Sequence, residues 1–354
     1  MKALIAMSGG VDSSVSALLT KQKGFDCIGC TMKLYANEDA AVSNEKTCCS
    51  LDDVADARSV ANRLQIPYYV FNFTDDFRAK VINKFIACYE KGITPNPCID
   101  CNRYMKFDKL YERAKVLGCD YIVTGHYARI EKNGEQYYLK KALDLTKDQS
   151  YVLYNLTAEQ LAHTMFPLGE LKKTEVREIA RANSFVNADK HESQDICFVP
   201  NGDYAKVIEH HTGKTYPAGN FVDKDGKVLG QHRGIIHYTV GQRKGLSISA
   251  AERLYVCSIC PENNTVCLCS RDELLQPEAV AAEFHWINGV PQKQQFHCHV
   301  KIRYNQKEQP ATVEIISADR VKIIFDQPQR AITPGQAAVL YDGDIVLGGG
   351  ILIK

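Results

Sequence analysis

The chain has 354 residues, of which 45% are hydrophobic and 24% are charged, and its formal net charge is +1. This composition excludes a disordered chain, and the length predicts two or three domains. No hydrophobic run is long enough to span a bilayer, and the first residues resemble a strand rather than a signal peptide, so we expect a cytoplasmic protein without membrane contact. With so small a net charge, any nucleic-acid contact must come from local basic patches.

A glycine turn joins the first predicted strand to the first predicted helix. The apolar run 3–7 is followed by Ser8-Gly9-Gly10-Val11-Asp12-Ser13-Ser14 and then by a helical pattern. Glycines let an anion approach the backbone, the helix start attracts it, and Asp12 can hold a divalent cation beside phosphates. The Walker A loop would need a lysine here and the dinucleotide fingerprint a third glycine, and neither is present. The turn therefore predicts a phosphate site of another kind.

Strand and helix patterns alternate over the first part of the chain. Expected strands cover residues 27–35, 68–73 and 121–124, and expected helices cover residues 54–64, 77–86 and 104–117. This alternation predicts an α/β fold with a doubly wound parallel sheet, in which ligands bind at the carboxyl ends of the strands. The opening turn, Met32 and Gly125-His126 all fall at such ends. We therefore predict the active site at this edge.

The second half of the chain changes character. Residues 140–190 favour helices, with one over 158–165 and one over 173–183 that Thr174 would cap. Beyond residue 205, turn signals at 223–226, 261–264 and 342–343 separate short alternating strands. We predict an N-terminal α/β domain over 1–204, a central β-rich domain over 205–274 and a C-terminal antiparallel β-barrel over 275–354. Strand alternation places Cys298 on the opposite face from His297 and His299, which argues against a metal site there.

Fourteen cysteines in a cytosolic chain are expected to be core thiols, metal ligands or catalytic groups. Cys101 lies near a helix start with Arg103 and Lys106 close by, which predicts a depressed pKa and a reactive thiolate. Cys197 lies between the helical and the β-rich regions. Spacing alone leaves structural and catalytic roles open for both.

A second group of cysteines lies in the β-rich region, at positions 257, 260, 267 and 269. Their spacing superficially suggests zinc, but both pairs fall in the strands of one predicted hairpin. Period-two alternation then predicts that some of these thiols are buried as small apolar groups.

Further motifs extend along the chain. They are Cys48-Cys49-Ser50, Asn96-Pro97 before Cys101, Thr124-Gly125-His126-Tyr127, Lys147-Asp148-Gln149-Ser150-Tyr151, Ser193-Gln194-Asp195-Ile196-Cys197-Phe198, Val240-Gly241-Gln242-Arg243-Lys244-Gly245-Leu246 and Arg303-Tyr304. Together with the opening turn they resemble the tRNA-specific 2-thiouridylases, which belong to the pyrophosphate-loop ATP pyrophosphatases. The resemblance runs nearly end to end and is specific, since other pyrophosphate-loop enzymes lack the paired cysteines.

The resemblance implies a function and a set of site residues. It implies ATP-dependent 2-thiolation of the wobble uridine in the anticodon of tRNA, with ATP and Mg²⁺ as cofactors and a persulfide donor or relay protein as a partner. ATP would be bound by Ala6, Met7, Ser8, Gly9, Gly10, Val11, Asp12, Ser13, Met32 and Gly125. The tRNA would contact His126, Lys147, Asp148, Gln149, Arg303, Tyr304 and Gln336. Cys197 would carry a persulfide and Cys101 would release its sulfur, leaving a Cys101–Cys197 disulfide, while Asp12 would serve the adenylation step.

Two alternatives to this mechanism and one further set of candidate RNA contacts remain open. The family often has Asp where this chain has Cys98, so Cys98, Cys101 and Cys197 could instead ligate an iron–sulfur cluster. Another pyrophosphate-loop tRNA-modifying ligase would use ammonia or an amine and would need no paired thiols. Basic residues in matching segments are candidate contacts for RNA phosphates: Lys140, Lys141, Lys172, Lys173, Arg177, Arg181, Arg243, Lys244, Lys301 and Arg303.

Overall fold

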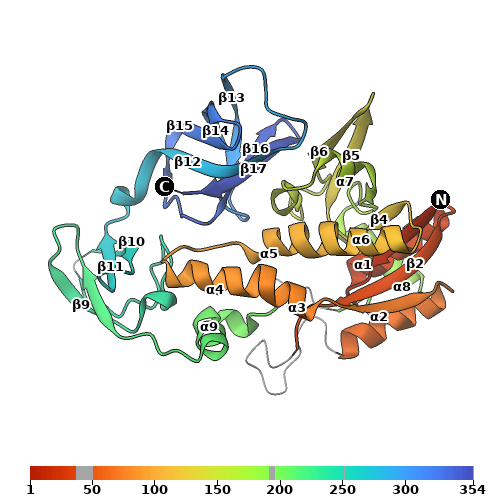
Figure 1. The fold of residues 1–354 in the computed structure, drawn as a ribbon, viewed down its shortest axis with the longest axis horizontal. Coiled ribbons are helices and arrows are strands. Elements are labelled where there is room, and N and C mark those ends of the chain that lie inside the picture. Colours follow the sequence, from red (N-terminus) through yellow and green to blue (C-terminus); the bar gives the residue numbers. More distant parts are fainter. Residues whose placement is uncertain (37–50, 191–195, 251, 354) are drawn as a thin grey trace. The chain divides into compact units, whose positions relative to one another are not determined.

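The computed structural model describes residues 1–36, 51–190, 196–250 and 252–353 (Figure 1). The chain divides into two compact units. The first consists of Met1–Val81, Cys98–Gly202 and Asp344–Leu347, and the second of Ile82–Pro97, Asp203–Gly343 and Gly348–Lys354. The motif Cys48-Cys49-Ser50 and the residues Ser193-Gln194-Asp195 lie outside the described residues. The domain boundaries after residues 204 and 274 stay predictions.

A parallel sheet forms the centre of the first unit. In the described residues its strands lie in the order β3-β2-β1-β4-β7, and each neighbouring pair is parallel. Because the chain moves outward from β1 in both directions, this is the predicted doubly wound arrangement. The strands are β1 Lys2–Ala6, β2 Asp26–Lys33, β3 Tyr68–Asn72, β4 Tyr121–Val123 and β7 Thr164–Met165.

Both faces of the central strand β1 are buried. Ala3 and Ile5 of β1 pack in one hydrophobic core with residues of α1, α2 and α8. Leu4 points to the opposite face by strand alternation and is just as inaccessible. The helices of this unit are α1 Val11–Gln22, α2 Leu51–Arg63, α3 Thr74–Phe77, the π-helix η2 Arg78–Ile82, α5 Pro97–Asp100, the π-helix η3 Cys101–Lys109, α6 Leu110–Val116, α7 Ala158–Ala162 and α8 Lys173–Ala182, with 3₁₀ turns at Ser150–Leu153 and Pro200–Gly202.

The region 140–190 differs from the sequence expectation in two ways. The predicted helix 158–165 ends at Ala162, because Thr164–Met165 pairs with β4 at the sheet edge. Helix α8 begins at Lys173 with Lys172 as its N-cap, so Thr174 is not the cap. Pairing at the sheet edge set the end of the first helix, and the extended backbone of Lys172 set the start of the second.

The sequence patterns did not predict the hairpin that precedes this region in the chain. Strands β5 Ala128–Asn133 and β6 Gln136–Lys141 pair antiparallel. Ile345 pairs with Lys140, and Arg129 forms an ion pair with Asp344 at 2.7 Å. These contacts explain why Asp344–Leu347 groups with the first unit.

The second unit is mainly β-structure, as predicted. Strands β10 Tyr255–Cys260, β11 Thr265–Cys269, β8 Gly219–Val222 and β9 Val228–His232 form one sheet in that order. The others are β12 Leu275–Trp286, β13 Gln295–Lys301, β14 Gln309–Ser317, β15 Arg320–Arg330, β16 Ala337–Asp342 and β17 Ile345–Leu352. Their order is β12-β15-β14-β13-β16-β17, and β12 also pairs with β17, which closes the predicted barrel. Its helices are α4 Asn83–Glu90 and α9 Tyr204–Thr212, with 3₁₀ turns at Ile235–His237 and Asp272–Leu274.

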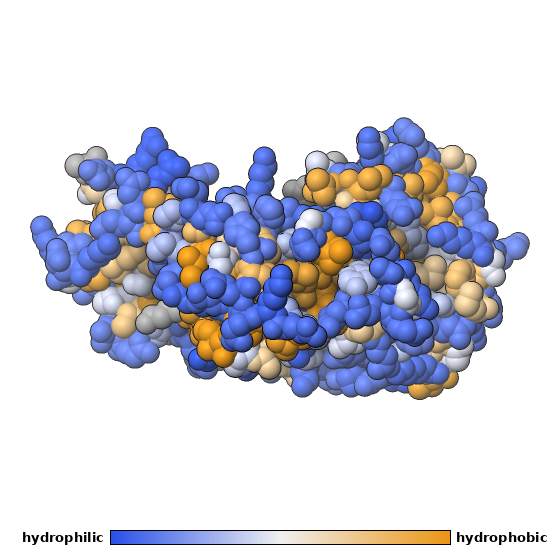
Figure 2. Space-filling model, turned by 90° about the horizontal axis from the view of Figure 1, so that it is seen from above, coloured by the Kyte–Doolittle hydropathy of each residue, from blue (hydrophilic) through white to orange (hydrophobic). Residues whose placement is uncertain are grey.

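The barrel strands follow the predicted alternation. In β13, Cys298 is buried while His297 and His299 are exposed. Among the described residues, no helix is long and apolar enough to cross a membrane. The face seen in Figure 2 is largely hydrophilic, and its hydrophobic residues lie in separate patches.

Candidate functional site

The opening turn, which we call the nucleotide loop (Ser8–Ser14), is held by its own serine hydroxyls. Ser13 Oγ accepts a hydrogen bond from the Ser8 amide at 3.1 Å and donates to the Gly10 carbonyl at 3.0 Å. Ser14 Oγ donates to the same carbonyl at 3.0 Å. Helix α1 begins directly after Gly10, so its first amide groups lack partners inside the helix. At the carboxyl end of the central strand, this arrangement suits a phosphate group.

Two glycines are required for this shape. Gly9 has a φ of +77°, and a Cβ added to it would lie 2.4 Å from the Asp53 carbonyl oxygen. Gly125 follows β4, and a Cβ there would lie 2.9 Å from the Ser13 backbone nitrogen. Without these side chains, the end of β4 and the start of α2 can both approach the nucleotide loop.

The carboxylate of Asp12 is held by residues that the sequence did not connect with it. Lys173 Nζ lies 2.7 and 2.8 Å from its two oxygens, and the Tyr127 hydroxyl donates to Oδ1 at 2.8 Å. Lys173 was predicted to contact RNA, but it is only 8% exposed and turns toward the nucleotide loop. The sequence did contain a signal, because Lys173 precedes the buried Val176 and Ala180 at helical spacing.

The segment that follows α8 also reaches the nucleotide loop. Asn187 Nδ2 donates to the Gly9 carbonyl at 2.8 Å and to Ser14 Oγ at 2.9 Å. Lys190 Nζ lies 2.6 Å from carboxylate oxygens of both Asp53 and Asp56. Burial opposes the charge on Lys190, but these hydrogen bonds raise its pKa overall. Sequence reasoning missed both residues, because nothing local links them to the loop.

The other residues predicted to bind ATP lie on the elements around the nucleotide loop. Ala6 ends β1, Met7 is buried between β1 and the loop, and Val11 begins α1. Met32 is the penultimate residue of β2, which pairs directly with β1. The predicted shared edge is therefore present, and the individual contacts with ATP stay predictions.

Cys101 begins the π-helix η3, directly after α5. Such helices often mark functional positions. Burial raises the pKa of the Cys101 thiol to about 11, and the nearby Lys106 ammonium lowers it only in part. The predicted depressed pKa is therefore wrong, because the loss of hydration outweighs one cation.

Lys106 links the surroundings of Cys101 to the end of β4. Its Nζ lies 3.2 Å from His126 Nε2, while His126 Nδ1 lies 2.7 Å from Thr124 Oγ1. An ammonium group can only donate, so Nε2 accepts and Nδ1 carries the proton. Burial and then Lys106 hold the pKa of His126 well below its usual range, so the ring is neutral at pH 7.

Cys197 is positioned by aromatic residues near the end of β2. The Tyr35 hydroxyl donates to the Cys197 carbonyl at 2.6 Å. The ring of the adjacent Phe198 packs edge-on against Phe77, with centroids 5.7 Å apart. These contacts fix the backbone of Cys197 at the predicted edge of the sheet.

The cysteines raise the question of a metal centre. Within the described ranges, no three His, Cys, Asp or Glu side chains converge to hold a metal ion. This argues against zinc at the cysteines of β10 and β11, and an iron–sulfur cluster on Cys98, Cys101 and Cys197 stays a prediction. Of the four cysteines of β10 and β11, Cys269 is buried and the other three are half-buried. Burial raises the pKa of Cys267 and of Cys269 to about 12.

Several predicted tRNA contacts of the first unit hold the fold together. Asp148 accepts from the Ala142 amide at 2.9 Å and from Ser150 Oγ at 2.7 Å. Gln149 Oε1 accepts from the Tyr127 amide at 3.0 Å. Lys147 is partly exposed beside them, and His126 is buried. The Gln149 bond holds the backbone of Tyr127, and RNA contacts of all four residues stay predictions.

In the second unit, Arg303 donates to the Ala331 carbonyl and, at 2.7 Å, to Thr333 Oγ1. Gln336 Nε2 donates to the Thr94 carbonyl at 2.9 Å, so it holds the segment that leads to Pro97. Tyr304 is exposed, with Lys301 Nζ 5.5 Å from its ring centroid. Tyr304 is thus the most accessible of the three, and their RNA contacts stay predictions.

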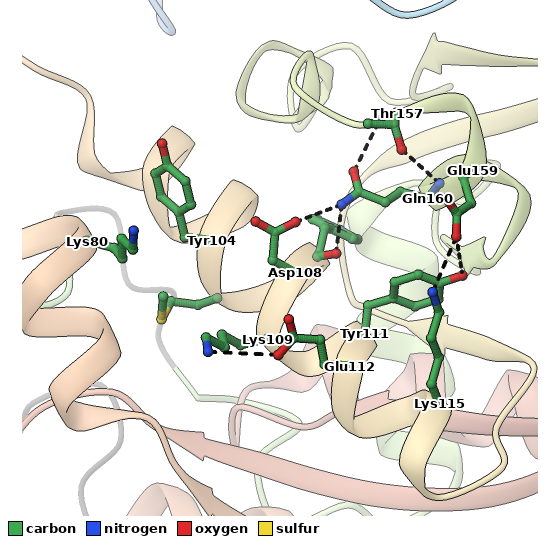
Figure 3. A pocket seen from close by; sticks show the side chains of 12 residues that line it. Lys80, Tyr104, Asp108, Lys109, Tyr111, Glu112, Lys115, Thr157, Glu159 and Gln160 are labelled. Atoms are coloured by element: carbon green, nitrogen blue, oxygen red, sulfur yellow. Dashed lines mark hydrogen bonds and ion pairs between the residues drawn. The ribbon is translucent and has the colours of Figure 1, made fainter.

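A cavity of about 620 Å³ lies elsewhere in the first unit (Figure 3). It is lined by Lys80, Tyr104, Met105, Phe107, Asp108, Lys109, Tyr111, Glu112, Lys115, Thr157, Glu159 and Gln160. None of the predicted ATP, sulfur or tRNA residues lines it. Its polar groups pair with one another, as Lys115 does with Glu159 at 3.3 Å and Gln160 with Asp108 at 2.9 Å. We therefore locate the candidate site at the nucleotide loop rather than in this cavity.

Comparison with known proteins identifies the families that match three parts of the chain. Residues 1–201 match the family described as the tRNA methyl transferase HUP domain, residues 205–270 match the tRNA methyl transferase PRC-barrel domain, and residues 277–352 match the aminomethyltransferase beta-barrel domain. In a solved complex of a 4-thiouridine synthetase with RNA and bound ATP, the match covers 60% of this chain and 51% of the synthetase chain, at 20% identity and a TM-score of 0.36.

Curated relatives match over the full length. The tRNA-specific 2-thiouridylase MnmA of Clostridioides difficile is 50% identical to this chain. The match covers 100% of this chain and 98% of that enzyme. The enzyme of the same name from Carboxydothermus hydrogenoformans is 49% identical with the same coverage. The chain that contains the nucleotide loop, Cys101, Cys197 and the closed barrel therefore belongs to the tRNA-specific 2-thiouridylase family.

Proposed function

We propose that this protein is a tRNA-uridine 2-sulfurtransferase that uses ATP to replace O2 of the wobble uridine with sulfur. The observation that carries this proposal is the identity of about half of all residues, over the whole chain, with proteins named tRNA-specific 2-thiouridylase. The nucleotide loop supports the ATP-dependent step, because its geometry suits phosphate. We further propose that the protein acts in the cytoplasm.

The first step of the proposed reaction is activation of the base. Uridine O2 attacks the α-phosphate of ATP, which forms an adenylated base and releases pyrophosphate. The amide groups at the start of α1 would stabilise charge on the departing pyrophosphate. The base must leave the anticodon stack to reach this edge of the sheet.

Magnesium would enter with ATP as part of the substrate. Mg²⁺ prefers carboxylate and phosphate oxygens, and Asp12 offers a partly exposed carboxylate at the nucleotide loop. That carboxylate is paired with Lys173, so a metal would have to share it or replace the lysine.

The second step is sulfur transfer. The terminal sulfur of a Cys197 persulfide bonds to C2 of the base, and AMP leaves with the former O2. Cys101, as a thiolate, attacks the inner sulfur of Cys197, so a Cys101–Cys197 disulfide remains and an external thiol must reduce it. A persulfide-carrying protein would reload Cys197. With a pKa of about 11, Cys101 must lose its proton within the complex before it can attack.

The test is a thiolation assay with unmodified tRNA, ATP and a persulfide source, read by mass spectrometry of tRNA nucleosides. We expect Cys101→Ser and Cys197→Ser to abolish 2-thiouridine while pyrophosphate release continues. Asp12→Ala should stop pyrophosphate release itself. Cys298→Ser, in a buried barrel position, is the matched control and should remain active. Normal thiolation by either serine variant would contradict the roles assigned to the two cysteines.

A further inference from the structure

We propose that Lys173 is a phosphate-binding residue of the nucleotide loop, whose ammonium group leaves Asp12 for the phosphates when ATP binds. This inference rests on the proposed function, because it needs ATP at this loop. It assigns Lys173 to the nucleotide and not to tRNA. It also explains why a carboxylate can lie where phosphates are to bind.

The first argument is geometric. Lys173 Nζ contacts both oxygens of Asp12, at 2.7 and 2.8 Å, and Asp12 lies in the first turn of α1. The Lys173 side chain is 10% exposed, whereas that of Asp12 is 31% exposed. The ion pair therefore has a shielded cationic side and an open anionic side. A phosphate arriving at the open side would meet the carboxylate first, and the ammonium lies within 2.8 Å of both carboxylate oxygens.

The second argument is electrostatic. The start of α1 carries partial positive charge that attracts phosphate, but the Asp12 carboxylate repels it. Lys173 neutralises that carboxylate while no nucleotide is bound. When ATP arrives with Mg²⁺, the cation can bind Asp12 and the ammonium can bind a phosphate oxygen. Each charge then keeps an opposite partner, and no buried charge is left alone.

The third argument is that the backbone of Lys173 is anchored while its side chain can move. The Lys173 amide donates to Asp144 Oδ2 at 3.1 Å, and Asp144 Oδ1 accepts from Thr146 Oγ1 at 2.6 Å. A lysine ammonium on a flexible stem can change partners without moving its helix. The Tyr127 ring, with its centroid 5.6 Å from Nζ, stabilises the cation in the position it has beside Asp12.

The experiment measures binding of ATP and of AMP to the full chain by calorimetry, with and without Mg²⁺. We expect Lys173→Met to weaken ATP binding roughly tenfold or more, the effect of losing one charge-assisted hydrogen bond, and AMP binding less than about twofold. Lys173→Arg should restore part of the loss. Asp12→Asn should strengthen binding of Mg²⁺-free ATP, because it releases Lys173 and removes the repelling charge.

A control variant and the outcomes that would overturn the inference complete this experiment. Lys132→Met removes an exposed lysine of β5 and should bind both nucleotides as the wild type does. Equal loss of ATP and AMP binding in Lys173→Met, or no gain in Asp12→Asn, would mean that the pair is only structural and would overturn the inference. If Lys173→Met does not fold, the double variant Asp12→Asn/Lys173→Met leaves no unpaired charge, and it should lose the gain seen in Asp12→Asn. A wild type that neither binds ATP nor thiolates tRNA would instead refute the proposed function.

Discussion

The nucleotide loop and the Cys101 segment differ in how far their functional groups are ready to react before a substrate binds. Around the loop, Asp12 is fixed by Lys173 and Tyr127, and Asn187 ties Gly9 to Ser14. Cys101, by contrast, lies in a buried setting that raises its pKa to about 11, so its thiol is protonated at neutral pH.

This difference matches the order of the proposed steps. Adenylation comes first and needs preorganised donors, which lower the barrier only if they are in place before charge develops. Sulfur transfer comes second, and a thiolate formed too early would be exposed to oxidation and to side reactions. In the proposed reaction, Cys101 would therefore lose its proton only at the second step.

The largest expected effect comes from disturbing the loop. Gly9→Ala combines a positive φ with a Cβ that would clash with the Asp53 backbone, so we expect pyrophosphate release to fall about 100-fold or more, the effect of about 3 kcal/mol in the barrier. Alkylation of Cys101 should be unchanged, which would separate the two regions experimentally.

The matched control is Gly24→Ala. Gly24 also has a positive φ, of +82°, but no atom lies within 4 Å of the added Cβ. It should lose about 1–2 kcal/mol of stability from backbone strain and keep its activity. Equal activity in the two alanine variants would show that loop shape does not limit the reaction.

A smaller effect is expected at Cys101. Lys106 is the group that lowers its pKa, so Lys106→Met should raise that pKa further and slow iodoacetamide alkylation at pH 8 by roughly threefold to tenfold. In the wild type, the rate should rise about tenfold per pH unit until about pH 11. Mass spectrometry of the Cys101 peptide measures both rates.

The sign of the accompanying stability change follows from the same shift. A raised thiol pKa favours the folded state below the ordinary cysteine pKa, and this contribution is lost as the pH rises toward 11.

The control for the alkylation experiment is Lys109→Met, since Lys109 lies on the same π-helix but pairs with Asp76 at 3.4 Å. An unchanged alkylation rate in Lys106→Met would mean that this ammonium does not act on Cys101.

The smallest effect is expected from Gln336→Ala. Losing the hydrogen bond to the Thr94 carbonyl should cost about 1 kcal/mol, because the carbonyl can regain a partner in water. If this bond orders the segment leading to Cys98, thiolation should fall by roughly fivefold while pyrophosphate release stays normal. Equal losses in both assays would argue for a direct role of Gln336 in tRNA binding.

The sequence predicted the elements whose signals are local. Strand and helix periodicity located β1 to β4 and the helices between them, because hydrophobic spacing reports which face is buried. Turn signals located the hairpins of the second unit, because those turns need particular residues. The nucleotide loop was likewise evident, since its glycines and serines form one short motif.

The tertiary structure decided what depends on distant residues. No local pattern could bring Lys173, Tyr127 and Asn187 to the nucleotide loop, because α8 and β4 reach it only through sheet packing. The same holds for Cys101, where nearby basic residues suggested a thiolate. Burial depends on the whole fold, and its desolvation cost exceeded the attraction of Lys106. The sequence by itself thus determined which chemical groups are present, and folding determined their partners, their charge and their accessibility.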